Sequence, residues 1–184
     1  MNLDEFVTKA KEYLPTATLE ESGKFYQNLL QKNYDKAVVA ELAKIDRWFL
    51  LVVLLNRKDA VHPWLYDRCR EIEKNPDGHL DLWARGHYKS TLITYAGAVQ
   101  EILKDPNITI GIFSHTRPIA KGFLKQIKRE FEVNDFLRDL FPDICYPNPR
   151  QDSPQWGEDA GIIVKRKSNP KEATVEAWGL VDGQ

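Results

Sequence analysis

Apolar residues recur at helical spacing near the start of the chain. Residues 4–14 place Phe6, Ala10 and Leu14 four positions apart, so these side chains share one face of a helix. Pro15 cannot continue that helix, because its ring clashes with the preceding turn and it has no amide proton. The pattern therefore predicts a short amphipathic helix that ends at Pro15.

Two further helices are predicted before residue 60. Thr18 and Glu21 have the spacing of a capping box, in which each side chain binds the other's free amide, and this favours a helix to about Lys32. A third helix is expected from Asp35. Its last part, residues 48–55, is apolar on every side, which indicates burial. A buried helix explains this run most simply, but a buried strand stays open because periodicity cannot separate the two in a short run.

A fourth helix, over residues 64–74, precedes a turn at residues 75–78. Proline and glycine in the turn sequence Asn-Pro-Asp-Gly supply the backbone angles that a reversal needs. In several nucleotide-dependent motors, residues that contact the base lie in the helix immediately before the strand that leads into the phosphate-binding loop. Trp64, Tyr66 and Arg68 are candidates for that contact, and the alternative for each is a packing aromatic or a solvated arginine.

Strands then alternate with a helix. Residues 80–84 are predicted as a strand, residues 90–103 as a helix and residues 108–114 as a buried parallel strand, because the last segment is apolar and β-branched. This order defines a βαβ unit. A right-handed crossover would bring residues 85–91 and residues 114–116 to the same carboxyl edge of the sheet, where ligands of open α/β sheets bind.

A helix over residues 118–140 carries a basic stripe opposite its apolar face. Such a stripe could follow the phosphate backbone of DNA, and the alternative is a solvated helix face. The stripe consists of Lys121, Lys125, Lys128 and Arg129.

The remaining segments complete an α/β fold. Residues 141–154 hold four prolines and are predicted as a loop, whereas residues 161–165 and 173–178 are predicted as strands. The chain is therefore expected to place an N-terminal helical segment, residues 1–60, on an α/β domain formed by residues 61–184 with a mainly parallel sheet.

Composition excludes several classes of protein. The chain has 184 residues, of which 42% are hydrophobic and 29% charged, so it can bury a core and is not disordered. A net charge of −1 and a pI near 6.4 mean that any DNA contact must be local. Cys69 and Cys145 form no disulfide framework and are expected to be reduced, buried thiols of an intracellular chain. No apolar run approaches the ~20 residues needed to cross a bilayer, and the acidic start is unlike a signal peptide.

The segment with the clearest chemistry is the loop that leads into Lys89 and Ser90. Backbone amides at a helix N-terminus are unpaired and carry the positive end of the helix dipole, so they attract phosphate. Lys89 would add a charge and Ser90 a hydroxyl for magnesium. In the pattern G-x-x-x-x-G-K-[ST] the glycines would fall at Trp83 and Tyr88, and only Gly86 supplies flexibility. An ordinary strand-to-helix connection with a solvated lysine is the alternative.

Three segments together resemble a known family. Residues 83–91, the strand end at residues 113–115 and the closing residues 174–184 are similar to the large terminase subunit of tailed bacteriophages. That family tolerates a deviant Walker A loop with an arginine shortly before the lysine, which matches Arg85. The resemblance covers about residues 62–184 and implies an additional-strand P-loop NTPase core with ATP and Mg²⁺ as cofactors.

The resemblance also implies roles for individual residues. Lys89 would bind the β- and γ-phosphates, Ser90 the magnesium ion, and Arg85 would act near the γ-phosphate. The same loop would contribute Gly86, His87, Tyr88 and Thr91 to the nucleotide site. In ring motors an arginine of one subunit often completes a neighbour's site. The possible arginines are Arg117, Arg129 and Arg138, and the possible DNA contacts are Lys121, Lys125 and Lys128.

The biological role that the resemblance implies is viral genome packaging. Such a motor hydrolyses ATP to drive double-stranded DNA into a capsid, and the full-length protein also carries an endonuclease. Its partners would be the portal protein, the small terminase subunit and further copies in a homo-oligomeric ring, docked on the procapsid in the host cytoplasm of an infected bacterium, without a membrane. The Walker B acids are expected beyond Gln184, so the chain is expected to be an ATPase-domain fragment that turns over little or no ATP.

Two other readings of the sequence stay open. Another P-loop nucleic-acid motor, such as a helicase, would share the βαβ core. A non-catalytic interaction module would use the Lys89 loop only as a connection. A metal enzyme has little support, because the four histidines are scattered: His62, His79, His87 and His115.

Overall fold

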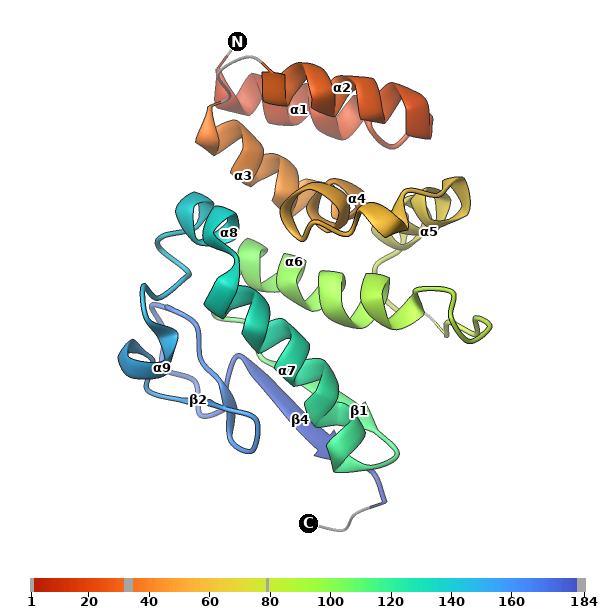
Figure 1. The fold of residues 1–184 in the computed structure, drawn as a ribbon. Coiled ribbons are helices and arrows are strands. Elements are labelled where there is room, and N and C mark those ends of the chain that lie inside the picture. The colour runs from red at the N-terminus through yellow and green to blue at the C-terminus, as the bar shows by residue number, and fades with distance from the viewer. Residues whose placement is uncertain (1, 32–34, 79, 182–184) are drawn as a thin grey trace. The chain divides into compact units, whose positions relative to one another are not determined.

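The computed structural model describes residues 2–31, 35–78 and 80–181, which form two compact units. The first unit, Met1–Leu92, is helical, and the second, Ile93–Gln184, carries the sheet (Figure 1). The units divide after Leu92, whereas the sequence predicts a domain division at residue 60. Predictions that concern Lys32, His79 and the closing residues 182–184 lie outside the described residues.

Three helices begin where the sequence predicts them. They are α1 (Leu3–Tyr13), α2 (Leu19–Gln31) and α3 (Lys36–Ile45). The capping box of α2 is present, because the Thr18 amide donates to Glu21 Oε2 at 2.8 Å and the Glu21 amide donates to Thr18 Oγ1 at 3.3 Å. The apolar face predicted for α1 is buried.

The apolar run at residues 48–55 is helical as far as Leu54 and is buried except at the half-buried Val52 and Val53, but the third predicted helix is not continuous. Asp46 has an extended backbone with φ −128° and ends α3. Its Oδ1 accepts a hydrogen bond from the Phe49 amide at 2.8 Å, so the same residue caps the next helix. That helix starts as α4 (Arg47–Phe49) and continues as the π-helix η1 (Leu50–Leu54).

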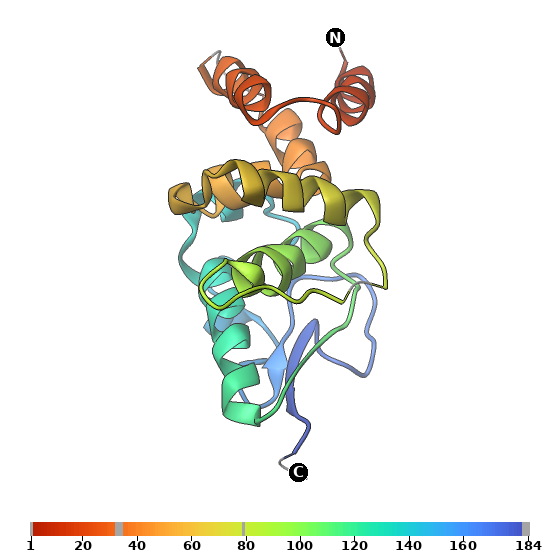
Figure 2. The same cartoon turned by 90° about the vertical axis from the view of Figure 1, so that its right-hand side faces the viewer.

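A short 3₁₀ turn and a longer helix follow in the first unit. The turn is η2 (Lys58–Ala60), and the helix is α5 (Pro63–Lys74), which begins one residue before the predicted start and ends at the predicted residue. Pro63 occupies the first turn of α5, where the missing amide proton costs nothing. Gly78 adopts φ +74° in the predicted turn after α5, a conformation that glycine reaches without steric cost. Figure 2 shows α5 in side view.

Residues 80–84 form no strand, so this prediction was wrong. Leu80 and Leu82 are 84% and 82% exposed, and the described sheet contains no strand from this segment. Alternating apolar residues favour an extended backbone, but a strand also needs a partner whose amides and carbonyls complete the ladder. The expected βαβ unit from residues 80–84 to residues 108–114 is therefore absent from the described sheet, and it gives no support for a P-loop core.

The helix predicted over residues 90–103 is present. It begins as the π-helix η3 (Ser90–Ala96) and continues as α6 (Gly97–Lys104). None of the helices in the described ranges is long and apolar enough to cross a membrane.

The sheet of the second unit has the order β1-β4-β3-β2. The strands β1 (Ile110–Ser114) and β4 (Val175–Gly179) are parallel, whereas β3 (Gly161–Ile162) pairs antiparallel with β4 and with β2 (Trp156–Gly157). Helix α7 (Arg117–Val133) packs on one face of the parallel pair (Figures 1 and 2). The parallel βαβ connection of this unit thus runs from β1 through α7 to β4.

The helix predicted over residues 118–140 is interrupted. Asn134 ends α7, and its side-chain oxygen accepts a hydrogen bond from the Leu137 amide at 2.9 Å to start α8 (Asp135–Leu140). The loop predicted at residues 141–154 contains a further short helix, α9 (Pro149–Asp152). A buried β1 was also predicted, but only Ile112 of that strand is buried, and Phe113 on the opposite face is exposed.

Candidate functional site

The loop before η3 forms the wall of a cavity of about 530 Å³. Residues 83–91 all line this cavity, together with Arg57 from the turn before η2. The residues that the sequence predicts for phosphate and magnesium binding, residues 85–91, therefore line one cavity, whereas the candidate base contacts Trp64, Tyr66 and Arg68 do not line it. The described residues that line it include three cationic side chains and no carboxylate.

Two left-handed residues shape the loop. Gly86 has φ +84°, which glycine adopts freely, and Tyr88 has φ +62°, which is uncommon for a bulky side chain. Tyr88 stands where the phosphate-loop pattern has its second glycine. The backbone at this position thus takes a conformation that glycine would favour, although the residue is tyrosine. The Leu92 amide then donates to the Tyr88 carbonyl at 2.9 Å as the helix begins.

An arginine–aspartate pair holds the Tyr88 side chain. Arg57 donates from Nε to Asp59 Oδ1 at 3.1 Å and from Nη2 to Oδ2 at 2.9 Å. The Tyr88 hydroxyl donates to Asp59 Oδ2, and the Arg57 guanidinium carbon lies 5.6 Å from the centroid of the Tyr88 ring. The hydrogen bonds from Arg57 and from Tyr88 hold the pKa of Asp59 well below its usual range. These contacts stabilise the unusual backbone of Tyr88.

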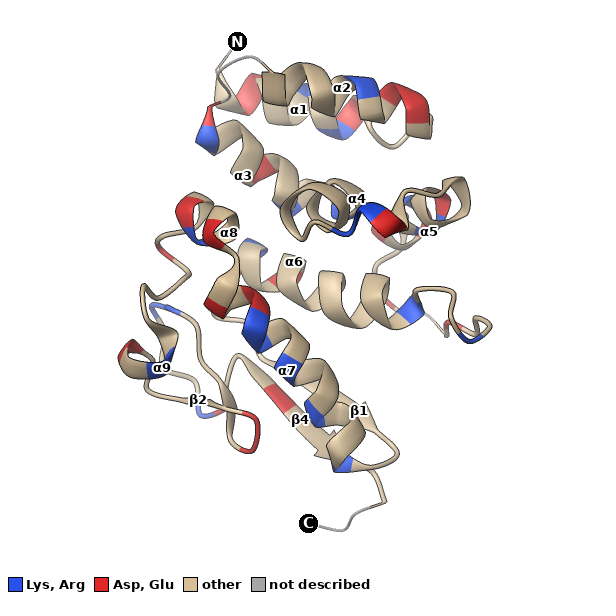
Figure 3. Ribbon diagram, in the orientation of Figure 1, with Lys and Arg blue, Asp and Glu red and all other residues tan. Residues whose placement is uncertain are grey.

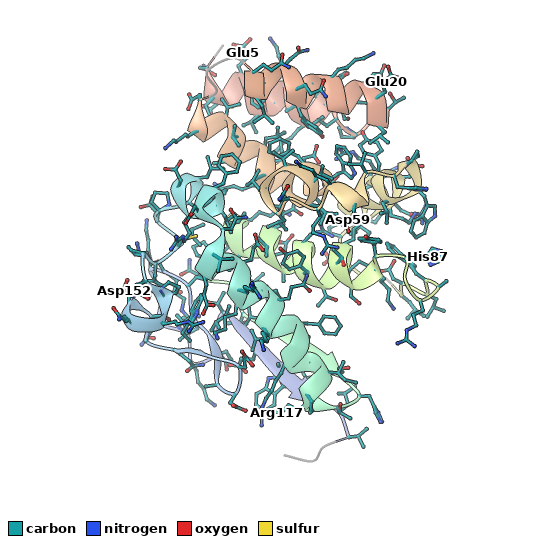
Figure 4. All side chains as sticks on the ribbon, viewed as in Figure 1. Glu5, Glu20, Asp59, His87, Arg117 and Asp152 are labelled. Atoms are coloured by element: carbon teal, nitrogen blue, oxygen red, sulfur yellow. The ribbon has the colours of Figure 1, made fainter. Side chains whose placement is uncertain are left out.

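Sequence reasoning missed Arg57 and Asp59. Both lie far before the loop in the chain, and a charged turn after an apolar helix is usually a solvated connection. The only signal was the position of that turn, Asn56-Arg57-Lys58-Asp59, directly after the buried apolar run. Figure 4 labels Asp59 on this turn and His87 in the loop.

Lys89 and Arg85 supply the other positive charges. The Lys89 ammonium donates to the backbone carbonyl of Asp81 at 3.2 Å, and both cationic side chains are exposed. No ion pair involves either residue in the part of the chain that the structure describes. Both charges therefore act on the cavity without a carboxylate to neutralise them, which favours an anionic ligand.

The predicted base contacts separate into three different environments. The Trp64 ring lies 4.9 Å from the Trp83 ring and 5.9 Å from the His87 ring, measured between centroids, so it packs against the loop. Tyr66 is buried, and its hydroxyl donates to a main-chain carbonyl at 2.7 Å. Arg68 pairs with a carboxylate on its own helix. Among these three, and within the described part of the chain, only the Trp64 ring contacts rings of the loop that lines the cavity.

Carboxylates compensate part of the basic stripe on α7, which Figure 3 shows as a row along the helix. Lys121 pairs with Asp159, and Lys128 lies 3.6 Å from the carboxylate oxygens of two glutamates. Lys125 and Arg129 are exposed and have no ion pair among the described residues. A DNA contact at this stripe stays a prediction, with Lys125 and Arg129 as its uncompensated members.

The candidate trans arginines have different surroundings within the second unit. Arg117, labelled in Figure 4, donates to the Asp159 carbonyl at 2.9 Å, and its guanidinium carbon lies 5.7 Å from the centroid of the Trp178 ring. Arg138 pairs with Asp135 and donates to a main-chain carbonyl at 3.0 Å. These contacts do not select an arginine for a neighbouring subunit, and that role stays a prediction.

No metal cluster stands out beside the cavity. Within residues 2–31, 35–78 and 80–181, no group of three or more His, Cys, Asp or Glu side chains is arranged to hold a metal ion. Ser90 and Thr91 bring hydroxyl oxygens to the cavity wall. Both cysteines are free and buried.

Comparisons with models of protein families, with curated proteins and with solved structures give no match to this chain. The functional interpretation therefore depends on the chemistry of the cavity and on the sequence of its loop.

Proposed function

We propose that the cavity binds the phosphates of ATP and that the chain belongs to the ATPase part of a viral DNA-packaging terminase large subunit. One observation carries this proposal: residues 83–91, which resemble a deviant Walker A loop, line a single cavity with Arg57. Arg57, Arg85 and Lys89 give that cavity three positive charges and no lining carboxylate. A polyphosphate is the anion that such a wall of cations and helix-terminal amides suits best.

Each side chain has a role in this proposal. Lys89 leaves the Asp81 carbonyl to bind the β- and γ-phosphates, and Arg85 lies near the γ-phosphate. Mg²⁺ takes oxygen ligands and usually keeps several waters and phosphate oxygens. The Ser90 hydroxyl would supply the protein's ligand, with Thr91 as a weaker helper. Trp64 would contact the base beside Trp83, because the centroids of the two rings lie 4.9 Å apart and Trp83 lines the cavity.

The wider role follows the family resemblance. ATP binding and hydrolysis would drive double-stranded DNA into a capsid, in a homo-oligomeric ring that works with the portal protein and the small terminase subunit. Lys125 and Arg129 are the basic residues best suited to a DNA contact, because no carboxylate pairs with them in the described part of the chain.

Calorimetric titration with Mg-ATP and a thermal melt test the nucleotide site. At an ATP concentration tenfold above Kd, binding should raise the stability of the folded chain by about 1.4 kcal/mol. Lys89→Ala should abolish both the heat of binding and the stabilisation. Lys9→Ala removes an exposed lysine from a surface ion pair on α1 and is the matched control, which should bind ATP like the wild type. A melt that millimolar Mg-ATP leaves unmoved would contradict the proposal.

The other two functions make different predictions in the same assays. An interaction module in which the loop is only a connection should show no effect of ATP and no effect of Lys89→Ala. A helicase should bind ATP through Lys89 and unwind duplex DNA. Unwinding would favour that second motor function over packaging.

A further inference from the structure

One residue of the cavity wall comes from outside the loop. The backbone of Arg57 is fixed, since its amide donates to the Leu51 carbonyl at 3.0 Å and its carbonyl accepts from the Ala60 amide at 2.9 Å. Ala60 is fully buried and anchors this turn. The guanidinium is partly exposed and lines the cavity. Arg57 therefore combines a fixed backbone with a side chain that can change its partner.

In the structure two donors of Arg57 bind Asp59. The same carboxylate accepts a hydrogen bond from the Tyr88 hydroxyl, and we call Arg57, Asp59 and Tyr88 the cavity triad. Arg57 and Tyr88 line the cavity, whereas Asp59 does not. The Asp59 carboxylate thus occupies the donors that an oxyanion in the cavity would use.

We propose that Arg57 is a further phosphate-binding residue of this cavity and that Asp59 competes with the phosphate for it. This inference rests on the proposed function. A guanidinium binds phosphate with the same two-pronged geometry that it uses for a carboxylate, so one ligand can replace the other. The exchange has a small cost, because the side chains of Arg57 and Asp59 are 30% and 49% exposed and exposed ion pairs are weak.

Tyr88 makes the exchange possible without an unpaired carboxylate. When Arg57 turns to the phosphate, Asp59 keeps the hydrogen bond from the Tyr88 hydroxyl and gains water at its exposed side. Tyr88 also precedes Lys89 directly, so the cavity triad ties the turn that holds Arg57 to the residue that would bind the phosphates.

Calorimetric titration of the whole chain with Mg-ATP and with inorganic tripolyphosphate tests the inference. Arg57→Ala should weaken binding of both ligands by about tenfold, because a charge-assisted hydrogen bond to phosphate is lost. Asp59→Asn keeps the shape of the side chain and removes the competing charge, so it should strengthen binding of both ligands by about three- to tenfold. Opposite signs for the two variants are the expected result.

Arg150→Ala is a matched control. Arg150 donates from Nε and Nη2 to the two carboxylate oxygens of Glu132 at 3.1 and 3.2 Å, the same two-donor pairing that Arg57 makes with Asp59. Arg150 is not part of the cavity wall. We expect its Kd for both ligands to stay within about twofold of the wild type, because it loses a similar ion pair without a phosphate donor. Arg57→Gln is the second variant for the test position, and circular dichroism checks the folding of each.

Several outcomes would overturn the inference. If Asp59→Asn weakens binding or leaves it unchanged, Asp59 only supports the loop and does not compete. If both Arg57 variants bind like the wild type, Arg57 is not a phosphate ligand. Should Lys89→Ala abolish binding while the Arg57 variants have no effect, only this inference fails. Should the wild type bind neither ATP nor tripolyphosphate, the proposed function fails with it.

Discussion

The first unit contains two clusters built from the same three residue types in different surroundings. In the cavity triad, Arg57 and Asp59 are partly exposed. In the second cluster, which we call the buried triad, Tyr26 and Arg70 both donate to Asp46 Oδ2, the latter at 2.9 Å. Asp46 is fully buried, and the Arg70 side chain is only 13% exposed.

Because the two clusters differ in burial, only the exposed cavity triad can change partners. A buried charge that loses its partner cannot be resolvated, so the buried triad holds one arrangement and fixes the packing of the helices around it. Burial, and then the charge of Asp46, raises the pKa of Tyr26, which keeps its hydroxyl protonated as a donor. An exposed pair has water as an alternative partner, so the cavity triad can exchange a carboxylate for an incoming anion.

Replacing the aspartate of each cluster by alanine should give the largest difference in stability between the two clusters. Asp46→Ala removes the buried acceptor of Tyr26, one of the two carboxylates that Arg70 binds and the side-chain cap of α4, so we expect a loss of about 2–5 kcal/mol in the free energy of unfolding. Asp59→Ala breaks an exposed pair and should cost at most about 1 kcal/mol. Urea denaturation followed by tryptophan fluorescence measures both, since the ring centroid of Trp48 lies 5.8 Å from that of Tyr26.

The comparison fails if the two alanine variants lose similar stability. That result would mean that water reaches Asp46 in the folded unit, or that the Asp59 pair contributes as much as a buried one.

Removing one tyrosine hydroxyl should have a smaller effect of the same kind. Tyr26→Phe takes a donor from the buried Asp46 carboxylate and should cost about 1–3 kcal/mol. Tyr88→Phe removes the matching donor from Asp59, which water can replace, so the urea midpoint should stay unchanged within error. Equal midpoints for the two phenylalanine variants would contradict the distinction between buried and exposed triads.

Local signals in the sequence were enough to predict most helices. The capping pair Thr18 and Glu21 and the proline at the start of α5 act within one turn, so their effect does not depend on the rest of the chain. Asp46 was missed as a break, because the apolar period continues across it. Only its extended backbone and its bond to the Phe49 amide reveal the new helix.

Features that depend on distant partners were predicted less well. Residues 80–84 have the apolar pattern of a strand, but the pattern does not supply the neighbouring strand that a ladder requires. Residues 83–91 could be proposed as a site from the sequence because they are contiguous in the chain. Arg57 and Asp59 meet Tyr88 only in three dimensions, so no spacing rule could place them in the site.

The smallest effect should be an opposite pH dependence in the two regions. Glu73 lies beside the buried triad, where its Oε2 accepts a hydrogen bond from Arg70 at 2.7 Å. Burial, and then the negative charge of Asp46, raises the pKa of Glu73 above its ordinary value of 4.5. The folded state therefore binds this proton more tightly than the unfolded state, and the stability from it is lost as pH rises from 4.5 through the folded pKa.

Glu73→Gln removes that titration and provides the test. As pH rises above 4.5, the urea midpoint of the wild type should fall relative to that of Glu73→Gln. Asp59 has the opposite sign, because its pKa is lowered from 3.8, so its contribution is present above 3.8 and is lost only as pH falls through the folded pKa. Asp59→Asn should therefore leave the pH dependence above 4.5 unchanged. If the difference in urea midpoint between the wild type and Glu73→Gln stays constant over this range, Glu73 is ionised in both the folded and the unfolded state. The buried triad would then tolerate a second negative charge as readily as the exposed cavity triad.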